Sequence, residues 1–275
     1  MSVADTSSMR DALYEEPGPK LRRKIRLWTV VSAVGVAWLI YLIVQAFYAH
    51  GQLNPKYWSF FTRLTTWSYL GQGFIGTVKV SLTAGAISLA LGLVLMLLRI
   101  SANKVLSGIA RVVIEFFRGV PSLLLIYFFF LVIPQYGIKM SSFWMITLPV
   151  ALAASGVLAE VFRAGMNAVP TGQREAALSL GMRPFKVTCK IVLPQAVRFV
   201  IPSLISQLVV VVKDTTVAYV VSYPDLLQNG RVLITNYNAL VSTYFVVAII
   251  YIVVNYLLNR AAIAVSRRTG AKIIR

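Results

Sequence analysis

Six long apolar runs dominate this sequence and limit what it can fold into. Each is close to the roughly 20 residues that a helix needs to cross about 30 Å of hydrocarbon. Hydrophobic residues make up 58% of the 275 residues and charged residues only 13%, too little polar surface to cover a soluble domain. The sequence therefore predicts an all-α integral membrane protein. The predicted spans are Leu27–Ala49, Phe74–Leu98, Val112–Ile133, Phe143–Phe162, Phe199–Val221 and Ala239–Leu258.

Lysine and arginine give the chain a formal net charge of +18. These residues flank the apolar runs and have no interleaved aromatic surface, so we expect membrane interfaces and no nucleic-acid binding. When the chain is threaded from a cytoplasmic N-terminus, most of them fall on the cytoplasmic side. This bias predicts that both termini are cytoplasmic. The exceptions are Lys56, Arg63, Lys139 and Arg231.

The two ends of the chain differ in composition from the apolar centre. Residues 1–26 are polar and end in a basic cluster, which predicts a cytoplasmic tail, and residues 263–275 predict a second, basic tail. The run 27–49 begins too late for a removable signal peptide and is predicted to be a retained accessory helix. The single Cys189 excludes an internal disulfide, and the lone His50 has no second ligand nearby, so no metal site is expected.

The third run is irregular. Its uninterrupted part, Gly119–Ile133, is too short to cross the hydrocarbon, and Pro121 is expected to bend or interrupt the helix. Glu115 stands three residues before Arg118, and Glu160 stands three residues before Arg163. Such pairs share a helix face, so each is interpreted as an ion pair at the cytoplasmic edge.

An unusually polar loop, residues 163–198, separates the fourth and fifth spans. Residues 173–180 are good helix formers, Gly181 stands where a left-handed residue would end a helix, and Pro184 can begin another. Apolar side chains on such a short helix are expected to need a groove on another protein. Packing of the loop helix against its own bundle remains the alternative. These side chains belong to Ala176, Ala177, Leu178 and Leu180.

The same loop resembles a known signature. The loop contains Glu175-Ala176-Ala177, then Gly181 after three intervening residues, Ile191 after nine more, and Leu193-Pro194. This pattern resembles the E-A-A-x3-G-x9-I-x-L-P motif of bacterial ABC importer permeases. The neighbouring segments 115–121 and 213–216 look like the subfamily for polar amino acids, namely histidine, glutamine, glutamate and arginine. The resemblance covers roughly residues 71–262.

The resemblance implies a type-1 ABC importer transmembrane domain, a five-helix core to which the N-terminal helix adds a sixth span. It implies that the loop is a coupling helix seated in a cytoplasmic ATPase, with roles for Glu175, Ala176, Ala177 and Gly181. The implied complex holds two ATPase subunits, a second permease and an extracytoplasmic binding protein in a bacterial cytoplasmic membrane. We expect the second permease to be a paralogue, because this chain has an extra helix.

No nucleotide-binding loop and no convergent catalytic set is evident in the sequence. The chain is therefore expected to be no enzyme and to hold no cofactor, with ATP and Mg bound by the partner subunit. The resemblance implies that the cargo is a polar amino acid, glutamate or a relative. An ion- or proton-coupled carrier or channel is the alternative, and it would require intramembrane acids or duplicated halves. A membrane enzyme would require a catalytic set.

Charged residues inside the spans are expensive and require partners. Lys213 and Asp214 lie near the middle of the fifth predicted span, where sequence neighbours point about 100° apart on a helix. Thr215 and Thr216 add hydroxyl groups to the same stretch. Two interpretations stay open: a place on the substrate path, or a structural network. Lys79 is near a span end and is expected to reach the headgroups.

Overall fold

The computed structural model describes residues 18–268, in which the chain is helical and has no strand. It consists of two compact units, one ending at Trp58 and the other beginning at Ser59. In the described part, five helices are long and apolar enough to cross a membrane, or six if a bent pair counts as one span. The six predicted apolar runs thus correspond to five unbroken candidate spans and one broken one.

The first unit holds one long helix, α2 (Pro19–Ala49), followed by a short 3-10 turn, η1 (Pro55–Tyr57). Helix α2 is one of the five helices that are long and apolar enough to cross a membrane. The helix begins at Pro19, so the basic cluster at positions 20–26, which the sequence placed in a tail, forms its first turns. Proline suits this position because the first helical N–H has no intrahelical acceptor. Residues 1–17 of the predicted tail lie outside the described residues.

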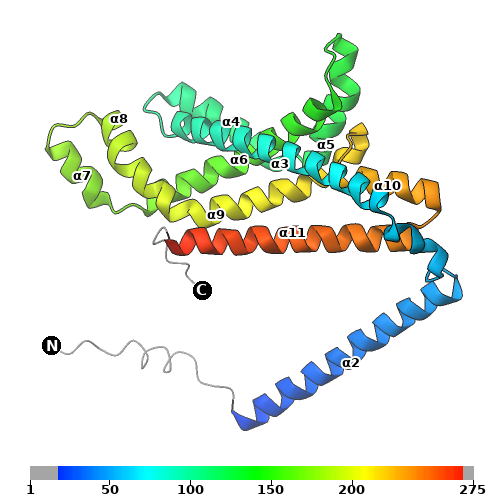
Figure 1. Cartoon of the computed structure of the whole chain (residues 1–275). Helices are drawn as coiled ribbons and strands as arrows, with labels where there is room; N and C mark the ends of the chain where they lie inside the picture. The colour runs from blue at the N-terminus through cyan, green and yellow to red at the C-terminus, as the bar shows by residue number, and fades with distance from the viewer. Residues whose placement is uncertain (1–17, 269–275) are drawn as a thin grey trace. The chain divides into compact units, whose positions relative to one another are not determined.

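The second unit is a bundle built on α3 (Leu64–Arg99), α6 (Ser142–Ala168), α9 (Leu193–Asp214) and α11 (Leu240–Arg268), preceded by a 3-10 turn, η2 (Ser59–Thr62). Helix α6 is the centre, packing along α3 and against α9, while α11 packs against α9 (Figure 1). Small residues allow the close approach of α3 and α6: a β-carbon on Gly92 would lie 2.8 Å from Cβ of Leu158. The predicted tail 263–275 is helical as far as Arg268, and 269–275 lie outside the described residues.

The third predicted span is broken. Helix α4 (Lys104–Gly119) and the segment Ser122–Tyr136 meet at a bend of 98°. That segment consists of α5 (Ser122–Tyr127), a π turn, η3 (Phe128–Val132), and a 3-10 turn, η4 (Ile133–Tyr136). The expected interruption at Pro121 is confirmed, because this proline caps α5 at the break. The run Val112–Ile133 therefore lies in one broken span and not in a continuous helix.

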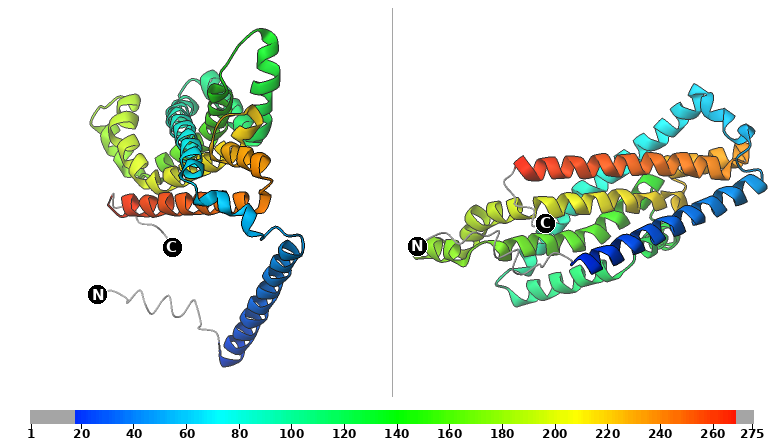
Figure 2. Two further views of the ribbon diagram at one scale, coloured as in Figure 1. Left: turned by 45° about the vertical axis from the view of Figure 1, so that its right-hand side comes forward. Right: turned by 90° about the horizontal axis from the view of Figure 1, so that it is seen from below.

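The two ends of the bundle carry different short elements (Figure 1, Figure 2). One end carries α7 (Thr171–Ser179) and α8 (Pro184–Val187), which a π turn, η5 (Thr188–Val192), joins to α9. The opposite end carries a 3-10 segment, η6 (Thr215–Val221), and α10 (Leu226–Tyr237). The fifth predicted span, Phe199–Val221, is therefore not one α-helix, because the α-helical part ends at Asp214.

Helix α3 binds the start of α10 closely. The Tyr223 hydroxyl donates to the Gly76 carbonyl at 3.3 Å, and the Leu226 N–H donates to the Thr77 hydroxyl at 3.1 Å. A β-carbon on Gly73 would lie 2.7 Å from the Asp225 carbonyl oxygen, so only glycine lets the backbones approach this far. These contacts fix the end of the bundle that carries η6.

Candidate functional site

Helix α7 ends in a Schellman motif, which fixes the turn after it. The Gly181 N–H donates to the Leu178 carbonyl at 2.9 Å, and the Met182 N–H donates to the Ala177 carbonyl at 3.2 Å. Gly181 has φ of +78°, the left-handed conformation that side chains other than that of glycine rarely adopt. The conformation predicted for Gly181 is confirmed.

One face of α7 rests on its own chain. Ala177 is only 6% exposed and packs in a small core with Val169, Val187, Val192 and Ala196. The expectation that Ala177 is exposed is wrong, since this single methyl group finds its core on the following helix. Thus the alternative, a loop helix packed against its own bundle, holds for one side of α7.

The other face of α7 is open. Glu175, Ala176 and Leu178 are exposed, and Leu180 at the end of the helix is 84% exposed. A cavity of 430 Å³ lies beside the helix and is lined by Thr171, Arg174 and the ends of α3 and α6. Helix α7 therefore presents small and apolar side chains on a narrow projection that this chain leaves uncovered.

The second half of the signature lies at the start of α9. Ile191 packs against the core under α7, Leu193 is partly buried and begins α9, and Pro194 is exposed in its first turn. The side chain of Gln195 donates to the Ile191 carbonyl at 2.9 Å. Because α8, η5 and α9 follow one another without a break, the seat of α7 is one end of a helical run that reaches Asp214.

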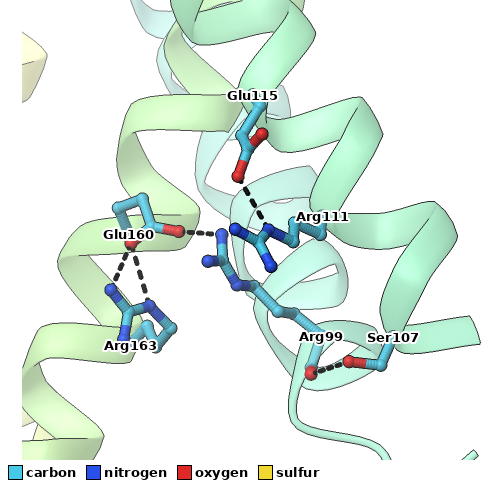
Figure 3. Close-up of polar contacts among 6 residues, drawn as sticks. All are labelled: Arg99, Ser107, Arg111, Glu115, Glu160 and Arg163. Carbon is cyan, nitrogen blue, oxygen red and sulfur yellow. Dashed lines mark hydrogen bonds and ion pairs between the residues drawn. The ribbon is translucent and has the colours of Figure 1, made fainter. Parts of the chain in front are cut away.

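A partly buried ion-pair cluster joins α3 to α6 near α7 (Figure 3). Glu160 accepts from Arg163 at 2.7 Å, which confirms that predicted pair, and its other oxygen binds Arg99 from the end of α3. Glu115 pairs with Arg111 at 2.9 Å and not with Arg118, so that prediction is wrong. Arg111, one helical turn before Glu115, binds the carboxylate as an i, i+4 partner. Arg99 was missed because it is 61 residues from Glu160.

Replacing Glu160 with glutamine is expected to destabilise the bundle by about 1–3 kcal/mol, because two partly buried guanidinium groups lose their shared carboxylate. Thermal unfolding of the purified protein in detergent measures the effect. The matched control is Glu115→Gln, whose pair with Arg111 is exposed on both sides and is expected to contribute little to stability. Equal shifts in Tm for the two variants would contradict the structural role of Glu160.

The four polar residues of the fifth predicted span lie where α9 gives way to η6. Thr215 is buried, donates to the Val212 carbonyl at 2.8 Å and shares a hydrogen bond with Ser81 of α3 at 3.1 Å. Lys213 is exposed, and Asp214 is half-buried. The Thr216 hydroxyl donates to the Lys213 carbonyl at 2.7 Å. Thr215 is therefore packed against α3, while Lys213 is exposed.

Comparisons with known proteins agree on one family. The profile described as "Binding-protein-dependent transport system inner membrane component" matches residues 88–271. The Glutamate transport system permease protein GluD of Corynebacterium glutamicum is 35% identical over 226 residues, 81% of this chain and 83% of that protein. The Probable glutamine ABC transporter permease protein GlnP of Bacillus subtilis is 33% identical over 200 residues, 71% of this chain and 91% of that protein.

A solved structure shares the fold. A chain from the crystal structure of an amino acid ABC transporter with histidines superposes with a TM-score of 0.71 at 27% sequence identity. The match covers 76% of this chain and 98% of the other. The described bundle therefore has the architecture of a type-1 importer transmembrane domain.

Proposed function

The chain belongs to the family of binding-protein-dependent transport system inner membrane components, and on this premise we propose that its cargo is glutamate or a closely related amino acid. It is a multi-pass permease subunit of an ATP-driven amino-acid importer of the bacterial cytoplasmic membrane. The 35% identity with a glutamate permease over 81% of the chain supports this cargo. The comparisons give no support to an ion- or proton-coupled carrier.

Helix α7 is the proposed docking element for the ATPase. The observation that carries this role is the two-sided arrangement of α7, in which Ala177 is buried on its own chain while Glu175, Ala176 and Leu178 are open. A projecting helix with small and apolar side chains fits a groove on a partner, and Glu175 offers a charge at the rim. The ATPase subunits bind ATP and Mg, and this chain contributes no chemistry.

The proposed orientation puts α7 and both termini in the cytoplasm, because most lysines and arginines flank the spans on that side. The proposed complex contains an ATPase dimer, an extracytoplasmic amino-acid-binding protein and a second permease. We favour a paralogue as that permease. Residues 71–262 form the proposed importer core, and α2 is the accessory span.

Reconstitution of the complete importer in proteoliposomes tests this function. Uptake of radiolabelled glutamate is expected to require enclosed ATP, the ATPase and the loaded binding protein together. A hydrolysis-deficient ATPase is the control and should abolish uptake while the complex still assembles. Uptake that needs no ATP and follows an imposed ion gradient would overturn the proposal.

A further inference from the structure

The segment after α9 has an exposure pattern with a period of three. Thr215, Ala218 and Val221 are buried. A second row, one residue further along the chain, is open. Tyr219 and Ser222 are exposed, and Thr216 is half-buried. Lys213, at the end of α9, precedes Thr216 by three residues and is also exposed. In a 3-10 helix, residues three apart lie directly above one another. The open side of η6 is therefore one row of polar side chains.

We name this row, Lys213, Thr216, Tyr219 and Ser222, the polar face. At about 2 Å per residue, it extends about 12 Å from Thr216 to Ser222. It belongs to a candidate membrane span, Pro184–Val221, and hydrocarbon offers exposed polar groups no hydrogen-bond partners. Its buried side carries a threonine, an alanine and a valine. A surface that is polar outward and largely apolar inward is expected to line an aqueous path.

Arg231 lies against Tyr219 of the polar face. Its guanidinium group, from α10, lies 4.6 Å from the centre of the Tyr219 ring, and the side chain is exposed. In the part of the chain that the structure describes, no carboxylate forms an ion pair with it. A guanidinium group stacked on a ring keeps its in-plane N–H groups free, and those match the two oxygens of a carboxylate.

The acids of this region do not cancel the positive charge. Asp225 is 1% exposed, accepts from the Gln228 N–H at 2.7 Å and lies 3.5 Å from the Tyr251 hydroxyl of α11. Its carboxylate thus faces the bundle. Asp214 is half-buried beside Lys213. The open surface therefore carries two cations, Lys213 and Arg231, separated by hydroxyl groups.

We propose that the polar face and Arg231 form a carboxylate-binding stretch of the translocation path, selective for amino acids with an acidic side chain. This inference rests on the proposed function and adds the residues that recognise the cargo. The Arg231 fork, beside Tyr219, receives one carboxylate, and Lys213 attracts the second charge. Because the segment 213–216 also resembles that of histidine and arginine permeases, the selectivity for an acidic side chain rests on Arg231.

The test compares Arg231→Gln with wild type in the reconstituted importer. Glutamate uptake is expected to fall about tenfold or more, because a carboxylate loses a charge-assisted partner. Stimulation of the ATPase by the loaded binding protein should persist. Arg231→Lys should recover part of the uptake, since it keeps the charge and loses the fork. Tyr219→Ala, which removes the stacking ring, should also lower uptake.

Lys56→Gln is the matched control, because Lys56 is the cation of a separate pair, 4.7 Å from the centre of the Tyr57 ring. It should transport as wild type does. Undiminished glutamate uptake by Arg231→Gln would overturn the inference, as would a fall accompanied by loss of ATPase stimulation. Failure of wild type itself to import amino acids with ATP would instead overturn the proposed function.

Discussion

Replacing Gly181 with valine is expected to uncouple ATP hydrolysis from uptake. Gly181 has φ of +78°, and a β-branched residue there is strained by about 1–2 kcal/mol or more. An added β-carbon would meet nothing within 4 Å, so the effect comes from the backbone and not from a clash. Loss of this conformation breaks the Schellman motif and turns α7 away from its proposed groove.

The readouts for Gly181→Val are glutamate uptake, ATPase stimulation and co-purification of the ATPase with the permease. Uptake should fall about tenfold or more, because a loss of about 1.4 kcal/mol in the binding free energy between α7 and the ATPase lowers the affinity tenfold. Gly181→Asn is the conservative control, because asparagine tolerates the left-handed region. Gly172→Val is the positional control: Gly172 lies on the same helix with negative φ and open space around it. Normal uptake by Gly181→Val would show that α7 does not couple ATP hydrolysis to transport.

Local signals in the sequence predicted much of this fold. The apolar runs located the spans, because crossing hydrocarbon requires a long apolar segment whatever its neighbours are. Pro121 and Gly181 were assigned correctly, since the geometry of proline and glycine is a property of the residue itself. Such features need no knowledge of tertiary contacts.

Tertiary contacts explain what the sequence did not predict. The change from α-helix to 3-10 helix after Asp214 lies within an apolar run, where hydropathy has no period that separates 3.0 from 3.6 residues per turn. Thr215 and Ser81, whose hydroxyl groups meet there, are 134 residues apart. The pairing of Glu160 with Arg99 was missed for the same reason. The polar face could not be predicted from the sequence, because its period of three is visible only in the exposure of the side chains in the structure.

The structure joins the two proposed sites through one helical run. Helix α7 rests on Val187 and Val192, which precede α9, and α9 continues to Lys213 and Asp214. A tilt of α7 by the ATPase would therefore be passed toward the polar face along this run, which contains the π turn η5 and Pro202.

The largest selective loss is expected from Lys213→Met. Lys213→Met removes an exposed charge and keeps much of the apolar stem, so membrane insertion should be preserved while the path loses a cation. Asp214→Asn is the neighbouring comparison: it keeps the shape and some hydrogen bonding of a half-buried group and removes a negative charge beside Lys213. Both variants should assemble with the ATPase and bind the loaded binding protein, but only Lys213→Met should lose most glutamate uptake.

Thr215→Val separates this selective loss from general damage to the same turn. Thr215 is buried and bonds to Ser81, so its replacement should lower the Tm by an amount that corresponds to about 1–3 kcal/mol. The surviving protein should retain its preference for glutamate, because this hydroxyl faces the bundle and not the path. Lys213→Met should show the reverse, an unchanged Tm with lost uptake. If Lys213→Met and Asp214→Asn instead lower the Tm as Thr215→Val does and dissociate in detergent, these residues belong to the structural network. Wild-type uptake by Lys213→Met would remove this residue from the path, because a cation that attracts the cargo cannot be deleted without changing the rate at which the cargo passes.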